Sequence, residues 1–115
     1  RDLVRAGAPV AACAFAAGVV EKACRRREIG GDEALALYAS LPNDEIGAAC
    51  AGQLAAAVAF WCVEADAAGA ALDRLQGGDG VLLATSIAEE FAQRGATPPP
   101  TAVAAAWRRL KSEDV

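Results

Sequence analysis

Apolar residues are concentrated in one long stretch of the chain, residues 46–63, which contains no charged side chain. Gln53 is its only strongly polar residue, and alanine, the residue with the highest helix propensity, dominates it. Branched residues that favour strands are few there, so the pattern predicts a helix rather than a buried strand. Asn43 is placed to cap this helix, and Asp44 and Glu45 follow where the helix dipole favours negative charge. We expect the remaining segments to pack against this central helix.

The central helix carries apolar positions on more than one side. Leu54, Val58 and Trp61 share one face, because positions i, i+4 and i+7 of a helix line up. Two further rows contain only small residues: Ala48, Gly52 and Ala56, and Ala51, Ala55 and Ala59. Such rows let a second helix backbone approach closely. The pattern favours the core helix of a bundle, with a membrane span or a dimerisation seam as alternatives. Acidic residues at both ends, with no Lys or Arg beside them, make the membrane span the weaker alternative.

Shorter segments with helical patterns precede the central one. Residues 9–27 predict a helix that ends in three consecutive arginines, where cations complement the helix dipole. We interpret this basic cluster as a solvated helix end, with phosphate or an acidic partner as the alternative ligand. Residues 33–40 predict a short helix capped by Asp32.

Two more helical segments follow the central one. The chain keeps a helical pattern up to residue 75, either without interruption or, as we favour, with a kink near Gly69. The glycine-rich loop at residues 77–80 lacks the Lys and Ser/Thr of a phosphate-binding loop, so we interpret it as a plain turn. Residues 81–94 then predict a helix with Glu89 and Glu90 facing outward. Gly95 provides its stop.

The last predicted helix follows three prolines and is capped by Thr101. Val103, Trp107 and Leu110 share one of its faces. Trp107 either docks into the bundle, which is the interpretation we favour, or stays exposed and anchors a partner. In the second case Trp107, Arg108 and Leu110 are the predicted partner-binding residues.

These segments together predict an all-α fold, a single-domain bundle of about five helices with an Ala-rich central helix, spanning residues 1–115. Alanine makes up roughly a quarter of the chain, far above typical usage, which is a composition common in bacteria with GC-rich genomes. The chain does not begin with Met, so we interpret Arg1 as the start of a fragment of a longer protein.

The composition removes several classes of function. A formal net charge of −4 disfavours non-specific binding of nucleic acid. Histidine is absent, and it is both the commonest general base and the commonest metal ligand. The four cysteines form no C-x-x-C pair and sit in apolar surroundings, which is typical of reduced, buried thiols in a cytoplasmic protein; they are Cys13, Cys24, Cys50 and Cys62.

Acidic residues offer the remaining route to catalysis. Glu21 with Glu28, and Asp66 with Asp73, are spaced to share a helix face, and Glu64 lies beside the apolar core. Carboxylate-bridged metal bundles also need Glu-x-x-His motifs, which this chain cannot supply. We interpret these acids as surface residues and predict no catalytic residue, no metal ligand and no cofactor.

The leading functional hypothesis is therefore a protein–protein interaction module. It would be an adaptor, regulatory or immunity-type helical domain, binding a protein partner or a second copy of itself. The alternative is a bundle that binds a small apolar ligand in a pocket lined by Cys50, Leu54, Phe60 and Trp61. A weaker alternative is a subunit or domain of an enzyme whose active site lies elsewhere.

Overall fold

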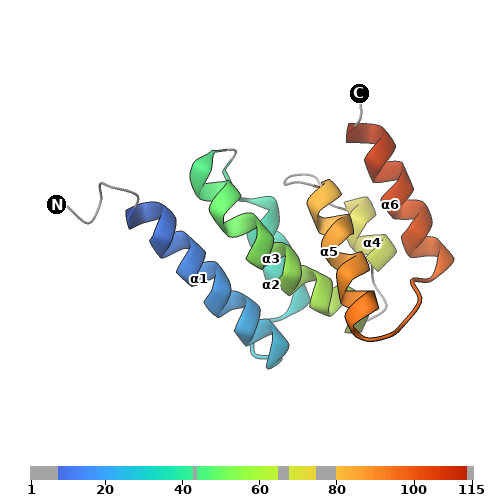
Figure 1. The fold of residues 1–115 in the computed structure, drawn as a ribbon, viewed down its shortest axis with the longest axis horizontal. Coiled ribbons are helices and arrows are strands. Elements are labelled where there is room, and N and C mark those ends of the chain that lie inside the picture. Colours follow the sequence, from blue (N-terminus) through green and yellow to red (C-terminus); the bar gives the residue numbers. More distant parts are fainter. Residues whose placement is uncertain (1–7, 43, 65–67, 75–79, 114–115) are drawn as a thin grey trace.

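The computed structural model describes residues 8–42, 44–64, 68–74 and 80–113, and these residues form six helices and no strand (Figure 1). In chain order the helices are α1 (Ala8–Arg25), α2 (Gly31–Ala39), α3 (Glu45–Glu64), α4 (Ala68–Arg74), α5 (Gly80–Gln93) and α6 (Pro100–Glu113). The predicted all-α bundle is confirmed. Its helix count exceeds the expected five because the segment after the central helix forms a separate helix, α4.

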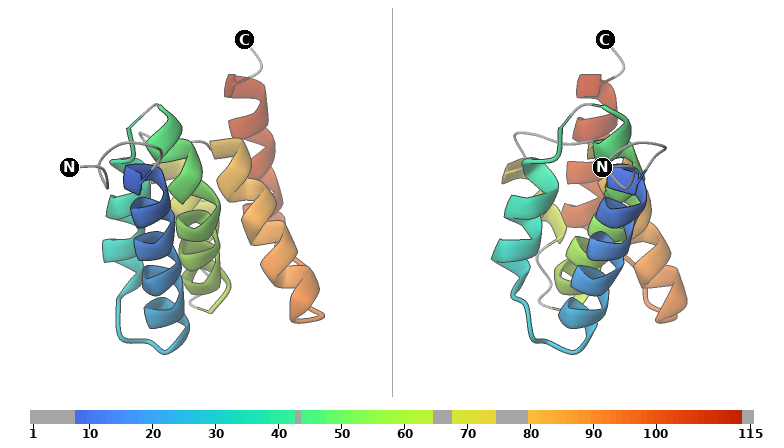
Figure 2. Two further views of the ribbon diagram at one scale, coloured as in Figure 1. Left: turned by 60° about the vertical axis from the view of Figure 1, so that its left-hand side comes forward. Right: turned by 90° about the vertical axis from the view of Figure 1, so that its left-hand side faces the viewer.

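The central helix of the prediction, α3, lies at the centre of the bundle. Figure 2 shows α1 and α2 on one side of α3, with α5 and α6 on the other. The short α4 packs mainly against α6, which also contacts α5. The described chain is elongated, with principal extents of 51 × 37 × 21 Å, so α1 and α6 occupy opposite ends (Figure 1).

The helix starts differ in detail from the predicted caps. Asp44 caps α3, since its Oδ1 accepts the backbone N–H of Gly47 at 3.0 Å; Asn43 lies outside the described residues. α2 begins at Gly31 with Gly30 in extended conformation as its cap, so the prediction of Asp32 as cap is wrong. α6 begins at Pro100, one residue before Thr101, the predicted cap. Proline is favoured at the first helical position, because a backbone N–H there would have no partner within the helix.

The interruption after the central helix falls earlier than the predicted kink near Gly69. α3 ends at Glu64 and α4 begins at Ala68, so a continuous helix to residue 75 is wrong. Gly69 has a different role, since a Cβ built on it would lie 3.2 Å from the backbone oxygen of Thr101. The glycine therefore permits a close approach of the α4 and α6 backbones.

Two helices end in the same backbone motif. At the end of α5, Gly95 has a φ of +66° and the N–H of Ala96 donates to the Phe91 carbonyl, as the prediction of a glycine stop requires. At the end of α1 the left-handed position is taken by Arg27, with a φ of +63°. A non-glycine residue is disfavoured there, because its Cβ crowds the following carbonyl oxygen.

The core combines a few large side chains with many alanines. Its largest fully buried side chains are Tyr38, Leu72, Leu83, Val58 and Cys24. The two small-residue rows of α3 have different surroundings: Ala55 and Ala59 are fully buried, whereas Ala48 and Gly52 are exposed. A Cβ built on Gly52 would have no atom within 4 Å. One side of the N-terminal half of α3 is thus left uncovered by the described residues.

α3 is long and apolar enough to cross a membrane by length and composition, alone among the helices within the described ranges. Half of its most apolar window is buried inside the bundle. A core helix meets the same criterion, so this finding carries no argument for a membrane span.

Candidate functional site

The predicted contact residues of the last helix lie at one end of the bundle. Trp107 is 63% exposed and Val103, one turn earlier, is 55% exposed. The favoured interpretation, that Trp107 docks into the bundle, is therefore wrong. α6 packs through Ala102 and Ala105, which are buried, and this attachment leaves Trp107 on the opposite side of the helix.

The other two predicted contact residues are Arg108 and Leu110. Arg108 is exposed, and its Nη2 donates to both carboxylate oxygens of Asp73 at 3.0 and 2.9 Å. This ion pair ties α6 to α4. The side chain of Leu110 lies outside the described structure, so its contact role stays a prediction.

The four residues of the predicted ligand pocket lie in or against the core. Cys50 and Leu54 are buried in the central cluster of apolar side chains. Trp61 donates its Nε1–H to the Ile29 carbonyl at 2.9 Å and packs edge-on against Phe60, with ring centroids 5.4 Å apart. The two surface grooves between α1 and α3 are lined by other residues. The pocket stays a prediction.

Three arginine side chains lie over the ring of Phe60. Its side chain is only 7% exposed, and the guanidinium carbons of Arg25, Arg27 and Arg94 lie 5.6, 5.6 and 5.0 Å from the ring centroid. These distances are within the range of cation–π attraction. Arg25 is the last residue of α1, and Arg27 and Arg94 lie in the turns that follow α1 and α5, so the ring of Phe60 on α3 lies where these three helices meet.

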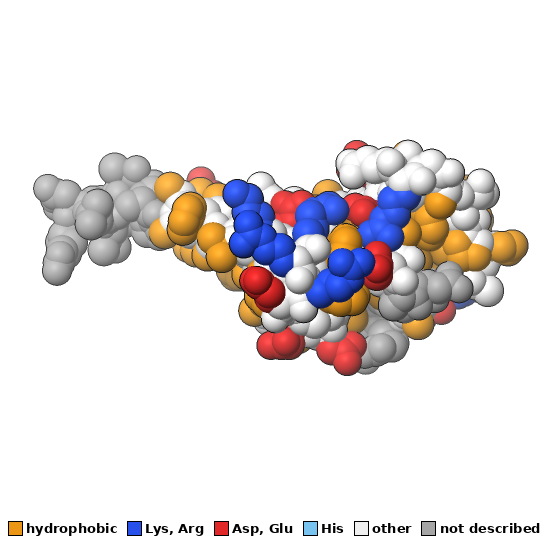
Figure 3. All heavy atoms as spheres, turned by 90° about the horizontal axis from the view of Figure 1, so that it is seen from below, with side chains coloured by type: hydrophobic (Ala, Val, Ile, Leu, Met, Phe, Trp, Pro, Cys, Tyr) orange, Lys and Arg blue, Asp and Glu red, His pale blue; other side chains and the backbone are white. Residues whose placement is uncertain are grey.

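A continuous chain of ion pairs joins these arginines to three glutamates. Arg25 bonds Glu21 at 3.0 Å and Glu90 at 3.1 Å. Arg94 bonds Glu90 and Glu64, each at 2.9 Å. Arg27 completes the chain by bonding Glu64. Figure 3 looks onto this end of the molecule and shows basic and acidic side chains interleaved. Each arginine has a carboxylate partner, so the group is electroneutral.

The electrostatics of this ion-pair chain favour charged glutamates. Hydrogen bonds from Arg27 and Arg94 lower the pKa of Glu64. Burial alone would raise the pKa of Glu90, but hydrogen bonds from Arg25 and Arg94 outweigh it, so its pKa is also lowered. The prediction that Glu90 faces outward is wrong, because Glu90 is buried.

The arginine cluster and the acids therefore act as structural groups. Arg26 and Arg27 are exposed at the end of α1, as predicted, but the charges of Arg25 and Arg27 are paired with Glu90 and Glu64 rather than free for phosphate. Arg26 alone of the three makes no ion pair with a described residue. Of the acids considered for catalysis, Glu21 and Glu64 belong to the ion-pair chain, and Asp66 lies outside the described residues.

The cysteines are all free thiols. Burial raises the pKa of Cys24 and Cys50, and it raises the pKa of Cys62 to about 12. A thiol that stays protonated at neutral pH is a poor nucleophile. Cys13 is half-buried and lies within hydrogen-bonding reach of Cys50 across the α1–α3 contact.

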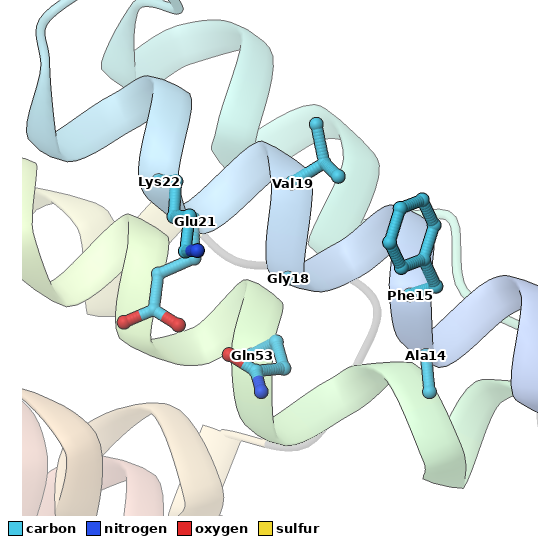
Figure 4. Close-up of a pocket in the computed structure, with 7 residues that line it drawn as sticks. All are labelled: Ala14, Phe15, Gly18, Val19, Glu21, Lys22 and Gln53. Atoms are coloured by element: carbon cyan, nitrogen blue, oxygen red, sulfur yellow. The ribbon is translucent and has the colours of Figure 1, made fainter.

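Two surface grooves that the sequence did not reveal lie between α1 and α3. One has a volume of about 380 Å³ and is lined by residues of α1 from Ala14 to Lys22 and by Gln53 of α3 (Figure 4). Phe15 lines this groove and is 75% exposed. The other is lined by Val10 and Ala11 of α1 and by residues of α3 from Glu45 to Ala49. The earlier residues of both helices meet in one groove and later residues of both meet in the other, so α1 and α3 run in the same direction.

The chain matches no protein-family model, no curated protein and no solved structure at a significant level.

Proposed function

We propose that the chain is a protein–protein interaction module that binds a partner through the outer face of α6. The observation that supports this best is the exposure of Trp107. Tyr38, Phe60 and Phe91 are buried in the same fold, and Phe15 at the far end of the molecule is the other exposed aromatic side chain. Exposed Trp is unusual in a packed domain and is enriched at the energetic centres of protein interfaces.

The face around Trp107 sets the chemistry of the partner. Val103 and Lys111 lie one turn before and one turn after Trp107, and both are exposed. Lys111 makes no ion pair with a described residue, whereas Arg108 is held by Asp73. An amphipathic helix with an apolar anchor and a nearby carboxylate would satisfy all three exposed positions. We therefore assign such a helix, from another protein, as the occupant of this face.

The test uses the variant Trp107→Ala and the matched control Leu37→Ala. Leu37 is also an exposed large apolar residue, but it lies on α2, away from α6. Each purified variant is immobilised, captured proteins are identified from a lysate of the source organism, and their affinities are measured by calorimetry. We expect a partner that binds the native chain and Leu37→Ala equally, and Trp107→Ala at least tenfold more weakly.

The melting temperature separates this outcome from loss of the fold. Because Trp107 is mostly exposed, Trp107→Ala should change the free energy of unfolding by no more than about 0.5 kcal/mol. A large loss of stability with unchanged partner affinity would show that Trp107 is a structural residue. Equal capture by the native chain and Trp107→Ala would also overturn the proposal.

A further inference from the structure

Two of the four cysteines meet across the contact between α1 and α3, and we propose that this pair is a modification site that closes to a disulfide when a hydroperoxide oxidises it. Cys13 lies on α1 and Cys50 on α3, and the two thiols are within hydrogen-bonding reach of each other. Both are free thiols in the described structure. α1 lies at the opposite end of the molecule from α6 (Figure 1), so the inference does not depend on the proposed function.

Each cysteine lies on the buried face of its helix. Cys13 is one turn before Ala17 on α1, and Cys50 is one turn before Leu54 on α3; Ala17 and Leu54 are both buried. Cys50 belongs to the central cluster of apolar side chains, and Cys13 packs against that cluster. The two side chains therefore point into the same contact from opposite helices.

The two cysteines are also level along the helices. Ala11, two residues before Cys13, and Ala49, one residue before Cys50, line the same groove between α1 and α3. Helices that pack through small side chains such as Ala17 have axes about 8 Å apart, so facing Cα atoms can come within about 6 Å of each other. A disulfide needs Cα atoms about 4.4–6.8 Å apart. The contact therefore allows the bond without unwinding either helix.

Exposure assigns different roles to the two thiols. Cys13 is half-buried, whereas Cys24, Cys50 and Cys62 are buried. A small oxidant therefore reaches Cys13 first. Burial raises the pKa of the Cys50 thiol, which keeps Cys50 protonated and a poor nucleophile toward oxidants in solution. Cys50 is thus the resolving thiol, which reacts only with the oxidised sulfur beside it.

The oxidation takes two balanced steps, with hydrogen peroxide as the oxidant. The Cys13 thiolate attacks one peroxide oxygen, the O–O bond breaks, and the departing hydroxide takes up the proton of the thiol to become water, which leaves Cys13 as a sulfenic acid. The Cys50 sulfur then attacks the Cys13 sulfur, the S–O bond breaks, and hydroxide leaves with the Cys50 proton as a second water. One peroxide is reduced to two waters, and the two thiols are oxidised to one disulfide. Two molecules of a small thiol reverse the change and are themselves oxidised to a disulfide.

The first test maps the bond. The reduced chain is treated with a small excess of hydrogen peroxide and denatured, the remaining thiols are alkylated, and chymotryptic peptides are analysed by mass spectrometry. Chymotrypsin cleaves after Phe60 and Trp61, so it separates Cys50 from Cys62. We expect a linked pair of peptides, one with Cys13 and one with Cys50, from a chain that is still monomeric. Sulfinic acid at Cys13 with Cys50 alkylated, or a disulfide between two chains, would overturn the inference.

The second test measures thermal unfolding by circular dichroism before and after oxidation. A disulfide between α1 and α3 restricts the unfolded chain, so oxidation should raise the melting temperature of the native chain by roughly 10 °C. A thiol reductant should then restore the original value. A melting temperature that oxidation leaves unchanged would contradict the proposal.

Two matched variants identify the thiols responsible. Cys13→Ala removes the half-buried thiol, and Cys62→Ala removes a buried thiol outside the pair. Each variant is compared with its own reduced form, so a change in stability caused by the substitution itself cancels. We expect no rise in melting temperature on oxidation of Cys13→Ala and the full rise for Cys62→Ala. The reverse pattern, or an equal rise in both variants, would overturn the assignment of Cys13 and Cys50.

Discussion

Glu90 joins two arginines inside the ion-pair chain, and Glu90→Gln tests how much this chain stabilises the fold. The glutamate side chain is 6% exposed and accepts hydrogen bonds from Arg25 at 3.1 Å and Arg94 at 2.9 Å. Glutamine has nearly the same shape, but its NH2 group would face a guanidinium, which has only donors. Removal of one partner of a fully buried pair costs about 3–5 kcal/mol.

The expected loss is smaller than that limit. Arg25 and Arg94 both retain access to water, and each keeps a second carboxylate partner, Glu21 or Glu64. We therefore expect Glu90→Gln to lower the free energy of unfolding by about 2 kcal/mol. For a chain of this length that corresponds to a decrease in melting temperature of roughly 8 °C.

The assay is urea and thermal unfolding followed by circular dichroism at pH 7. The matched control is Glu89→Gln, at the preceding position, because Glu89 is exposed and makes no ion pair with a described residue. It should change stability by no more than about 0.5 kcal/mol. Equal stability of the two variants would refute the reasoning that the buried carboxylate stabilises the junction of α1 and α5.

Three further measurements test other parts of the structure. Gly47→Ala should lower stability by roughly 1–3 kcal/mol in urea unfolding, despite the better helix propensity of alanine, because the new Cβ would overlap the backbone oxygen of Pro42; an unchanged midpoint contradicts this packing. Iodoacetamide should modify Cys13 before Cys62 in the native chain, because the pKa of Cys62 is about 12, and equal rates by peptide mass spectrometry would argue against that burial. The pKa of the Glu64 carboxyl is lower in the folded chain than in the unfolded chain, so the unfolded chain binds a proton there more tightly. The contribution of Glu64 to the free energy of unfolding is therefore present above pH 4.5 and decreases as the pH falls below it. A melting temperature that stays constant from pH 7 to pH 3 would contradict this.

The helices of the described structure were largely predictable because their signals are local. Alanine content, apolar periodicity and the stop at Gly95 depend only on residues close together in the sequence. The caps were less predictable, since Gly30 and Asp44 compete with equally good neighbours and the tertiary structure selects among them. Such shifts of one or two residues are normal at helix ends.

The burial of Glu90 depends on residues far apart in the chain. Its spacing of seven from Leu83 does place Glu90 on the buried stripe of α5, so the sequence contained a signal. The sequence did not reveal the partner of Glu90, because Arg25 lies 65 positions away on another helix. Burial of a carboxylate on the apolar face of a helix can be predicted only when its cationic partner is known.

The position of Trp107 was mispredicted for a related reason. Size suggested that the tryptophan would dock, but α4 offers α6 a close backbone approach at Gly69, which only small residues can use. Ala102 and Ala105 therefore take the buried positions. The grooves between α1 and α3 were missed because their lining comes from two helices far apart in the sequence, so no local pattern brings these residues together.

The alanine attachment of α6 also has a consequence for local unfolding. Ala102 and Ala105 remove little apolar area from water, and the ion pair between Arg108 and Asp73 is exposed. α6 is therefore held by a smaller share of the folding free energy than α1, α3 and α5, and its amides should exchange with deuterium first. A partner helix bound to Trp107 would suppress this opening of α6. Part of the binding free energy would therefore be used to order α6, the helix that carries the binding site.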